Sequence, residues 1–336
     1  MGGEYFRFRR GFVALVLLVA CVALTSQSFA DSFPNLGTAG NYAVLEISNA
    51  AISTVSVTGP SGITGNVGIA PSGAQFSITG SSFVTGTVFL ATGDTYSDST
   101  SGFIGGVQSN LNLSQPIADA YAASAAASLL TPTLTLSSVL GTNYTINGNG
   151  GLNVISLAGI NYTAANTTFT LNGTAADSFV LNVSSTFVMN QNTDLIRVTG
   201  GVATNHVLFN FATSGTDIHF GGGGTGATGE GIYLSTLRKI DLGPGTVLGE
   251  VIGGNDITIT SGGRVIGVPE PSSCALVLTA LGILGVAARK PTCRSQPGAS
   301  RHCHCCRPTL RVGVPFHGHR RAAGTPAKMT FGGVLA

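Results

Sequence analysis

The feature that most constrains the fold is a series of very short apolar alternations, each interrupted by Gly, Asn or Asp. Alternation of apolar and polar residues is the period-2 pattern of a half-buried β-strand. Such runs recur at residues 169–171, 179–181, 187–189, 196–198, 207–209, 232–234, 240–242, 257–259 and 265–266. A sandwich typically has longer strands at steadier spacing, whereas short strands with sharp corners are typical of parallel β-helix coils. We therefore predict an all-β body in which each coil buries its inward side chains against its neighbours.

One segment breaks the β pattern. Residues 116–130 are rich in alanine, follow Ser114 as a predicted N-cap, and stop at Thr131 and Pro132. We predict the one substantial helix of the body here. Its run of alanines gives it a thin side that can lie close against a sheet.

Composition supports a folded β body and limits its partners. Only 9% of the residues are charged and 48 are Gly, so residues that usually line exposed helix faces are scarce. Residues 31–267 carry twelve acidic and four basic side chains, a net charge of −8. Nucleic-acid binding needs clustered Lys and Arg, so no nucleic-acid partner is expected. All six cysteines lie outside 31–267, so the body must hold together by packing without disulfides.

The N-terminus, residues 1–30, has the pattern of a secretory signal peptide. Three arginines precede an apolar stretch over 11–24, and small residues favour cleavage between Ala30 and Asp31. We predict an N-terminal signal helix that directs export. The alternative is a lipoprotein signal, because the residues before Cys21 resemble a lipobox and would make Cys21 a lipidated N-terminus.

Near the C-terminus, the motif Val268-Pro269-Glu270-Pro271 precedes an apolar run, 274–288, and the basic pair Arg289-Lys290, a predicted stop-transfer. Together, residues 268–290 resemble a PEP-CTERM sorting signal. The run is shorter than the roughly 20 residues that span a bilayer, but short helices are usual for this signal. We therefore predict a membrane helix over 274–288, with the basic pair on the cytoplasmic side. The resemblance implies processing near the motif by an exosortase-type enzyme, in a bacterium that makes exopolysaccharide. An ordinary C-terminal membrane anchor is the alternative with the same topology.

Residues 291–336 extend beyond the point where such signals normally end. They hold seven bases, no acid and the cluster His302-Cys303-His304-Cys305-Cys306. These potential ligands are more crowded than those of a structural zinc site, so neither a metal nor a cofactor is expected. We interpret the segment as a disordered basic tail of non-native origin, on the cytoplasmic side.

The N-terminal part of the body contains the stretches LGTAGNYAVL at 36–45 and ITGNVGIAPSG at 63–73. They look like the N-terminal signature of the ice-binding-protein-like β-helix family of bacteria and fungi, which the body resembles. Segments similar to its C-terminal half follow the helix, at 179–181, 198–201, 207–211, 251–253 and 257–262. The resemblance covers 35–267 and implies an irregular parallel (right-handed) β-helix of roughly triangular section, with one long α-helix alongside. A second PEP-CTERM-bearing surface family with Gly-rich coils is the alternative match.

The resemblance also suggests where ice would bind. Some relatives carry a Thr-Ala/Gly-x-Thr/Asn motif on the ice-binding face, and two stretches match it, Thr163 to Asn166 and Thr225 to Thr228. The alternative is that each is a turn or a coil edge. Two departures from the family concern Phe209 and Phe211, which stand where many members carry Trp, and residues 231–236, which lack the usual small residues. The first is conservative packing, and the second can reshape a surface.

Enzymatic functions are not favoured. Asp217 and His219 share one face of a predicted strand, but the other acids are scattered and no nucleophile motif accompanies them. We therefore interpret Asp217 and His219 as a solvated pair and not as a catalytic dyad. The Gly-rich stretch 221–231 lacks the Lys-Ser/Thr of a phosphate loop and is interpreted as a wide irregular corner. We therefore expect a non-enzymatic exported protein, extracellular or at the outer cell surface after transient anchoring in the inner membrane, that binds ice. The alternative is a structural or adhesive component of the exopolysaccharide matrix.

Overall fold

The computed structural model describes residues 32–48, 53–70, 73–162, 164–190, 193–221 and 226–268. In these ranges the protein is mostly β, with parallel strands and one α-helix, which confirms the predicted solenoid-like fold. None of the helices within the described ranges is long and apolar enough to cross a membrane. The predicted signal peptide, the membrane helix over 274–288 and the basic tail lie outside the described residues.

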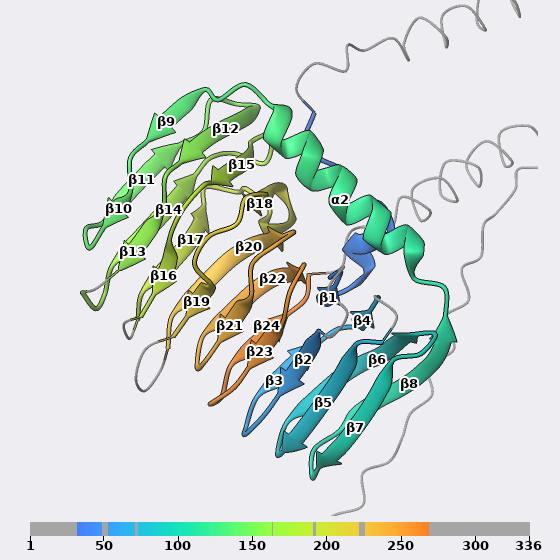
Figure 1. The fold of residues 1–336 in the computed structure, drawn as a ribbon. Helices are drawn as coiled ribbons and strands as arrows, with labels where there is room; N and C mark the ends of the chain where they lie inside the picture. The colour runs from blue at the N-terminus through green and yellow to red at the C-terminus, as the bar shows by residue number, and fades with distance from the viewer. Residues whose placement is uncertain are drawn as a thin grey trace, which may run out of the picture. The chain divides into compact units, whose positions relative to one another are not determined.

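A nine-stranded parallel sheet, sheet B, forms one side of the body (Figure 1). Its strands lie side by side in the order β10-β13-β16-β19-β21-β23-β2-β5-β7. Their bounds are β2 (Thr54–Val57), β5 (Gln75–Gly80), β7 (Thr95–Thr100), β10 (Val139–Leu140), β13 (Ile160–Tyr162), β16 (Phe187–Met189), β19 (Ile218–Phe220), β21 (Ile240–Leu242) and β23 (Ile257–Ile259).

A fifteen-stranded sheet supplies the two other sides of each coil, which we call side A1 and side A2. Side A1 contains β3 (Gly62–Thr64), β11 (Tyr144–Asn147), β14 (Thr168–Asn172), β17 (Leu195–Thr199) and β24 (Arg264–Ile266). Side A2 contains β1 (Val44–Glu46), β4 (Val67–Ile69), β9 (Leu134–Leu136), β12 (Leu152–Leu157), β15 (Ser178–Val183) and β18 (Val207–Phe211). Four longer strands turn the corner and belong to both sides: β6 (Phe83–Ala91), β8 (Ile104–Leu111), β20 (Thr228–Ser235) and β22 (Thr246–Gly253). Each coil therefore runs from A2 through sheet B to A1.

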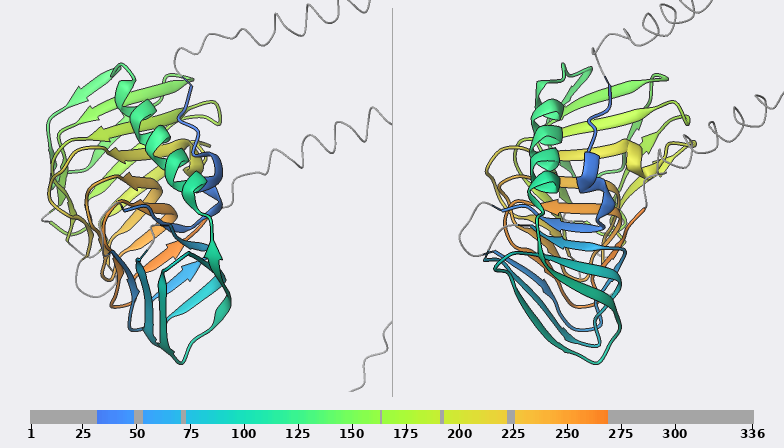
Figure 2. Two further views of the ribbon diagram at one scale, coloured as in Figure 1. Left: turned by 45° about the vertical axis from the view of Figure 1, so that its right-hand side comes forward. Right: turned by 90° about the vertical axis from the view of Figure 1, so that its right-hand side faces the viewer.

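The coils do not stack in sequence order. The C-terminal strand β24 pairs with β3, and β1 pairs with β22. The coils formed by residues 44–111 consequently continue the stack beyond the last C-terminal coil (Figure 2). The helix α2 (Ser114–Leu129) then carries the chain to the other end of the stack, where β9 begins.

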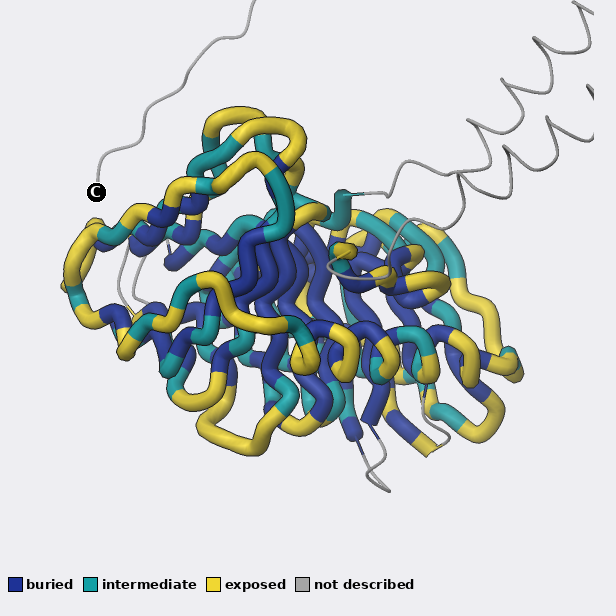
Figure 3. The backbone as a smooth tube through the Cα atoms, turned by 90° about the horizontal axis from the view of Figure 1, so that it is seen from above, coloured by how far each residue is buried: buried dark blue, intermediate teal, exposed yellow. Residues whose placement is uncertain are grey.

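The interior is filled by inward side chains from all three sides, mainly Val, Ile, Leu and Phe. Figure 3 shows buried backbone along the stacked strands and exposed backbone concentrated at the corners. Phe187 lies at the centre of an aromatic cluster, with its ring centroid 5.3 Å from those of Phe211 and Phe220. The ring of Tyr233 stacks on Phe209 at 4.8 Å. Phe209 and Phe211 are both fully buried, as expected if Phe replaces Trp by conservative packing.

The helix α2 covers side A2 with its alanine side. Ala120, Ala123 and Ala127 are buried, and they share a second apolar cluster with outward residues of side A2 such as Val180 and Leu208. Small side chains let the helix backbone lie close to the sheet. A polar contact sits inside this seam, where Ser124 Oγ donates to Asn210 Oδ1 at 2.7 Å and Asn210 Nδ2 donates to the Ser124 carbonyl at 3.1 Å. The helix lies close to the predicted range of 116–130.

The start of the helix differs from the prediction. Leu113 occupies the N-cap position and makes no side-chain capping bond, so the prediction that Ser114 is the N-cap was wrong. Ser114 is already helical, and its N–H is satisfied by Asn112 Oδ1 at 3.1 Å. The helix is fastened instead by Asp119, whose Oδ2 accepts hydrogen bonds from Thr38 N at 2.7 Å and Thr38 Oγ1 at 2.6 Å. This contact ties the short 3-10 helix η1 (Gly37–Asn41) to α2; a second such helix, η2 (Thr204–His206), precedes β18.

Candidate functional site

The outward side chains of four adjacent strands in sheet B are small and hydroxylated. In β23, β2, β5 and β7 the outward positions carry Ser or Thr, apart from Gln75 and Asp256 at the start of two strands. We call these residues the hydroxyl array: Thr54, Ser56, Thr58, Ser77, Thr79, Thr95, Ser97, Ser99, Thr258 and Thr260. None of them is buried.

The strand register places the array residues in straight columns. Thr258 lies opposite Ser56, which lies opposite Ser77, which in turn lies opposite Ser97. Neighbouring strands in a sheet are about 4.8 Å apart, and alternate residues along a parallel strand are about 6.6 Å apart. The hydroxyls are therefore set on a two-dimensional lattice that repeats in both directions.

The inward residues of the same strands hold this lattice in place. Val55, Val57, Phe76 and Ile78 alternate with the array residues along β2 and β5, and all four are fully buried. Phe76 stacks on Tyr96 of the next strand at 5.9 Å. The alternation of hydroxyl and apolar residues thus both specifies the strand and presents every second side chain to solvent.

Polar side chains at the corners fasten both ends of the array strands. At the start, Asp256 Oδ1 accepts a hydrogen bond from Thr54 N at 2.8 Å, and Asp94 Oδ1 accepts from Gly73 N and Ala74 N. At the end, Ser82 Oγ lies 2.7 Å from the carbonyl oxygens of both Gly59 and Thr79.

The array hydroxyls behave differently from the corner hydroxyls. Within the ranges that the structure describes, no side-chain hydroxyl of the array makes a hydrogen bond to another residue. The corner hydroxyls bind backbone carbonyls, whereas those of the array are left for solvent or a ligand.

A buried carboxyl lies behind the first corner of the array. Glu46 ends β1, is fully buried, and accepts a hydrogen bond from Ser48 N at 3.1 Å. Burial raises the pKa of Glu46 to about 8, and the charges of Asp256 and Asp94 act in the same direction. Glu46 is therefore mainly protonated at neutral pH, so the corner carries less negative charge than the sequence indicates.

The remaining strands of sheet B have a different outward surface, which we call the mixed half. Its central column continues through Asp241, His219, Val188, Asn161 and Leu140. His219 Nδ1 lies 3.4 Å from Asp241 Oδ2, on the next coil, and both side chains are about 30% exposed. The partner of this histidine is thus Asp241 and not Asp217, the residue before β19, because Asp241 lies directly opposite His219 on the neighbouring strand.

Asp177, at a corner away from sheet B, accepts hydrogen bonds from backbone N–H groups. Asp177 accepts from Gly150 N at 2.7 Å and from Thr174 N at 2.8 Å. These hydrogen bonds lower the pKa of Asp177 well below its usual range. Among the residues the structure describes, no three His, Cys, Asp or Glu side chains are grouped as metal ligands would be.

On the two other sides of the coils, the described strands carry no comparable lattice. Side A2 is covered by α2. On side A1 the outward column runs from Glu230 through Leu248 and Ile266 to Thr64, so charged and apolar residues are mixed. Arg264 lies over the ring of Phe83 at 5.3 Å on the same side.

The two residues of the four-residue motifs that the structure describes, Asn166 and Thr228, lie away from the array. Thr163 and Thr225 lie outside the described residues. Asn166 sits at an exposed corner with a φ of +63° and accepts a hydrogen bond from Thr193 Oγ1 at 2.7 Å. Thr228 begins β20 on side A1, opposite Leu195 and Thr246. The Gly-rich stretch 221–231, predicted to be an irregular corner, includes the start of strand β20 at Thr228.

Sequence reasoning missed the hydroxyl array. The pattern that could have revealed it is the alternation of hydroxyl and apolar residues over 54–58, 75–79 and 257–260. The apolar residues of this alternation mark the inward positions of a strand, and the hydroxyl residues mark its outward positions. The four-residue motifs instead pointed to residues outside sheet B, such as Asn166 and Thr228.

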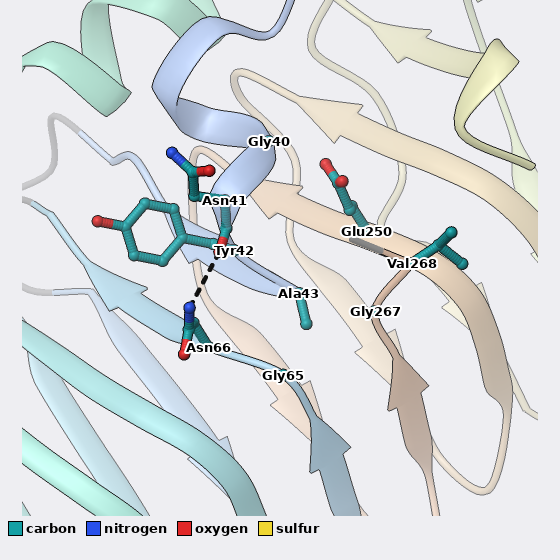
Figure 4. Close-up of a pocket in the computed structure, with 9 residues that line it drawn as sticks. All are labelled: Gly40, Asn41, Tyr42, Ala43, Gly65, Asn66, Glu250, Gly267 and Val268. Atoms are coloured by element: carbon teal, nitrogen blue, oxygen red, sulfur yellow. Dashed lines mark hydrogen bonds between the residues drawn. The ribbon is translucent and has the colours of Figure 1, made fainter. Parts of the chain in front are cut away.

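The sorting motif begins where the last coil ends. Gly267 N donates to the Thr64 carbonyl at 2.8 Å, and Val268 follows beside a cavity of about 380 Å³. The cavity is lined by residues 40–43, 65–66, 250 and 267–268 (Figure 4). Asn66 Nδ2 donates across it to the Asn41 carbonyl at 3.3 Å. We call this region the exit corner; it joins sides A1 and A2.

Comparison with solved structures identifies ice-binding proteins as structural neighbours. A glycosylated ice-binding protein from Arctic yeast matches with a TM-score of 0.50 and 18% identity, over 72% of this chain and 98% of that one. An ice-binding protein from an Antarctic biological consortium is 19% identical over 71% of this chain and 92% of that one, with a TM-score of 0.48. One from the Antarctic ascomycete Antarctomyces psychrotrophicus is 19% identical over 72% and 100%, with a TM-score of 0.46. The resemblance predicted from the sequence is thus confirmed for the fold.

The C-terminal motif is matched independently. Residues 267–290 match the PEP-CTERM protein-sorting motif, which confirms the predicted sorting signal. That motif implies export and processing by an exosortase-type enzyme. No curated protein matches the chain.

Proposed function

We propose that this protein is a non-enzymatic ice-binding protein that acts at the cell surface and contacts ice through the hydroxyl array. The observation that carries the proposal is the lattice of outward Ser and Thr side chains on β23, β2, β5 and β7, whose hydroxyls have no protein partner within the described ranges. Threonine suits such a face because its methyl group orders neighbouring water while its hydroxyl fits a hydrogen-bonded lattice.

The way the array is built supports the same proposal. Its side chains project from strands that are already fixed by buried residues such as Phe76 and Ile78, so little further ordering is needed on binding. Pre-organisation of this kind reduces the entropic cost of association. The central column of the array carries only Ser and Thr, whereas that of the mixed half carries His219 and Asp241.

The proposal is tested with purified residues 31–267 and two matched variants. Ser77→Tyr places a large side chain in the central column of the array, and Val188→Tyr places the same side chain in the central column of the mixed half. We expect the unmodified body to show thermal hysteresis and to inhibit ice recrystallisation. Ser77→Tyr should lose most of this activity, and Val188→Tyr should keep it.

Circular dichroism of each variant, with a heat-denatured sample, controls for folding. Inactivity of the folded unmodified body would exclude ice as the ligand. Equal activity of all three proteins would place the ice-binding surface outside sheet B. In that case the motif residues Thr163, Asn166, Thr225 and Thr228, which we propose as a second candidate contact, become the next to test.

We further propose how the protein is exported and processed. Residues 1–30 are removed on export, and the solenoid over 31–267 winds as a right-handed β-helix. The helix over 274–288 holds the chain in the inner membrane until the exosortase-type enzyme acts near Pro269-Glu270-Pro271, leaving the basic tail in the cytoplasm. The mature protein is then extracellular or at the outer cell surface.

A second candidate function is a structural or adhesive role in an exopolysaccharide matrix. The sorting motif favours it, and the amide, carboxylate and imidazole groups of Asn161, Asp241 and His219 on the mixed half offer contacts for a glycan. Co-sedimentation of the purified body with purified exopolysaccharide tests this role. Retention that is lost in Asn161→Tyr but not in Ser77→Tyr would support it.

A further inference from the structure

We propose that the attached protein displays the hydroxyl array away from the surface that holds it, because the attachment point and the array lie on opposite parts of every coil. This inference needs the proposed processing near the sorting motif, but it does not need ice as the ligand. It follows from the path of the chain around one coil.

Each coil runs through its three sides in a fixed order. In the last complete C-terminal coil, the second part of β22 lies on side A2, β23 lies in sheet B and β24 lies on side A1. The chain leaves after β24, at the corner between A1 and A2. Of the three corners this is the one that does not touch sheet B, so it lies across the coil from the array strands β23 and β2.

The exit is held firmly up to the motif itself. Arg264, Val265 and Ile266 pair with β3, and Gly267 N donates to the Thr64 carbonyl. Val268 lines the exit-corner cavity beside Asn41 and Asn66. The sorting motif therefore starts without any spacer after the last hydrogen bond of the fold.

The missing spacer limits how far the body can turn. A chain advances at most about 3.6 Å per residue, so the three residues from Val268 to Pro271 reach only about 11 Å. The body is wider than this tether, because each coil packs sheets whose faces lie about 10 Å apart in addition to the outward side chains. A surface attached near Pro271 must therefore lie against the exit corner, with sheet B on the far side.

The chain offers a clean way to measure this orientation, because residues 31–267 contain no cysteine. Ser77→Cys places one thiol in the array, and Thr64→Cys places one at the exit corner. Thr64 is exposed and Ser77 is half-buried in the free body. In the free body, exposure alone would therefore make the thiol of Thr64→Cys react faster with a bulky reagent than that of Ser77→Cys.

The experiment expresses each full-length variant in a cell with the matching sorting system and labels intact cells with a membrane-impermeant polyethylene-glycol maleimide. Labelling is divided by the value reached after denaturation, and the unmodified chain gives the background. We expect attachment to invert the order, with Ser77→Cys labelled several-fold faster than Thr64→Cys. Thr170→Cys, on side A1 away from the exit, should fall between them.

Two results would overturn the proposal. If Thr64→Cys is labelled faster on cells, as its exposure alone predicts, the exit corner does not face the surface. If both sites are protected equally, the body has no fixed orientation or is buried in matrix. Labelling requires no ice activity. If Ser77→Cys is labelled faster than Thr64→Cys on cells but the protein fails the ice assay, the proposed orientation stands and only ice as the ligand is excluded.

Discussion

The hydroxyl array and the mixed half belong to one sheet and share one interior, yet their outer surfaces differ completely. Behind both halves lie apolar, fully buried residues, including Phe76 and Ile78 on one side and Phe187 and Ile218 on the other, whereas inward Asp98 of the edge strand β7 is exposed. In front, the array repeats Ser and Thr, whereas the mixed half shows Leu, Asn, Val, His and Asp along the same column.

The comparison shows that the period-2 pattern of a strand separates two tasks. The inward positions determine whether the coil forms, and the outward positions are free to take on a binding function. A flat binding surface can therefore occupy only part of a continuous sheet. The predictions below test whether the two halves are equal in stability and unequal in function.

The largest expected effect comes from removing an inward aromatic ring from either half. Phe76→Ala and Phe187→Ala should each lower the free energy of unfolding by about 3–5 kcal/mol, because a buried ring is replaced by a cavity. Phe187 should lie at the upper end, since it contacts four other rings. Urea unfolding measures both. A loss below 1 kcal/mol for Phe76 would mean that the array is not supported by tight packing.

The second effect is a pH dependence that originates behind the array. Glu46 has a pKa of about 8 in the fold against an ordinary value of 4.5, so between these values the folded protein retains a proton that the unfolded chain releases. Stability should therefore fall as pH rises through this window, by at most about 1.4 kcal/mol per pH unit.

Urea unfolding from pH 5 to 8 measures this slope, and Glu46→Gln should flatten it. Asp177 has a lowered pKa, so its contribution is constant in this range and decreases only at more acid pH. A Glu46→Gln protein with an unchanged slope would assign the pH dependence to another group.

The third effect compares a corner beside the array with a corner between sides A1 and A2 that does not touch sheet B. Asp94→Asn weakens hydrogen bonds from Gly73 N, Ala74 N and Ala91 N beside the array, and Asp177→Asn weakens those from Gly150 N and Thr174 N at the other corner. Each should cost about 1–3 kcal/mol. Thermal unfolding should show similar losses, whereas ice-recrystallisation inhibition, measured on folded samples, should fall more for Asp94→Asn. The reverse order of activities would contradict the assignment of the array.

The smallest effect concerns the ion pair of the mixed half. His219 and Asp241 are partly exposed and 3.4 Å apart, so His219→Ala or Asp241→Asn should change stability by less than about 1 kcal/mol. Neither substitution should alter ice activity. A clear loss of ice activity in either variant, with the fold intact, would extend the binding surface into the mixed half.

The sequence predicted those parts of the fold that depend on local pattern. The apolar alternations identified the strands, and the alanine-rich stretch identified α2, because both patterns are complete within a few residues. The prediction failed at the first residue of α2, where a tertiary contact between Asp119 and Thr38 replaces the expected cap.

The array could not be predicted in the same way, because it depends on which coils are neighbours. Thr258 stands beside Ser56 only through the pairing of β23 with β2, two strands separated by most of the chain. No local signal specifies that pairing. Reading motifs along the sequence could therefore find corner residues such as Asn166, but not a surface assembled from both ends of the body.

The pairing of β24 with β3 and of β22 with β1 has a consequence for biogenesis. An exported chain crosses the membrane with its N-terminus first, so the coils of residues 44–111 emerge long before their partners. They remain without a neighbour on one side until β24 has crossed, and the next residues to arrive belong to the sorting motif. We therefore expect the solenoid to be completed at nearly the same time as the sorting motif emerges, because the motif directly follows β24.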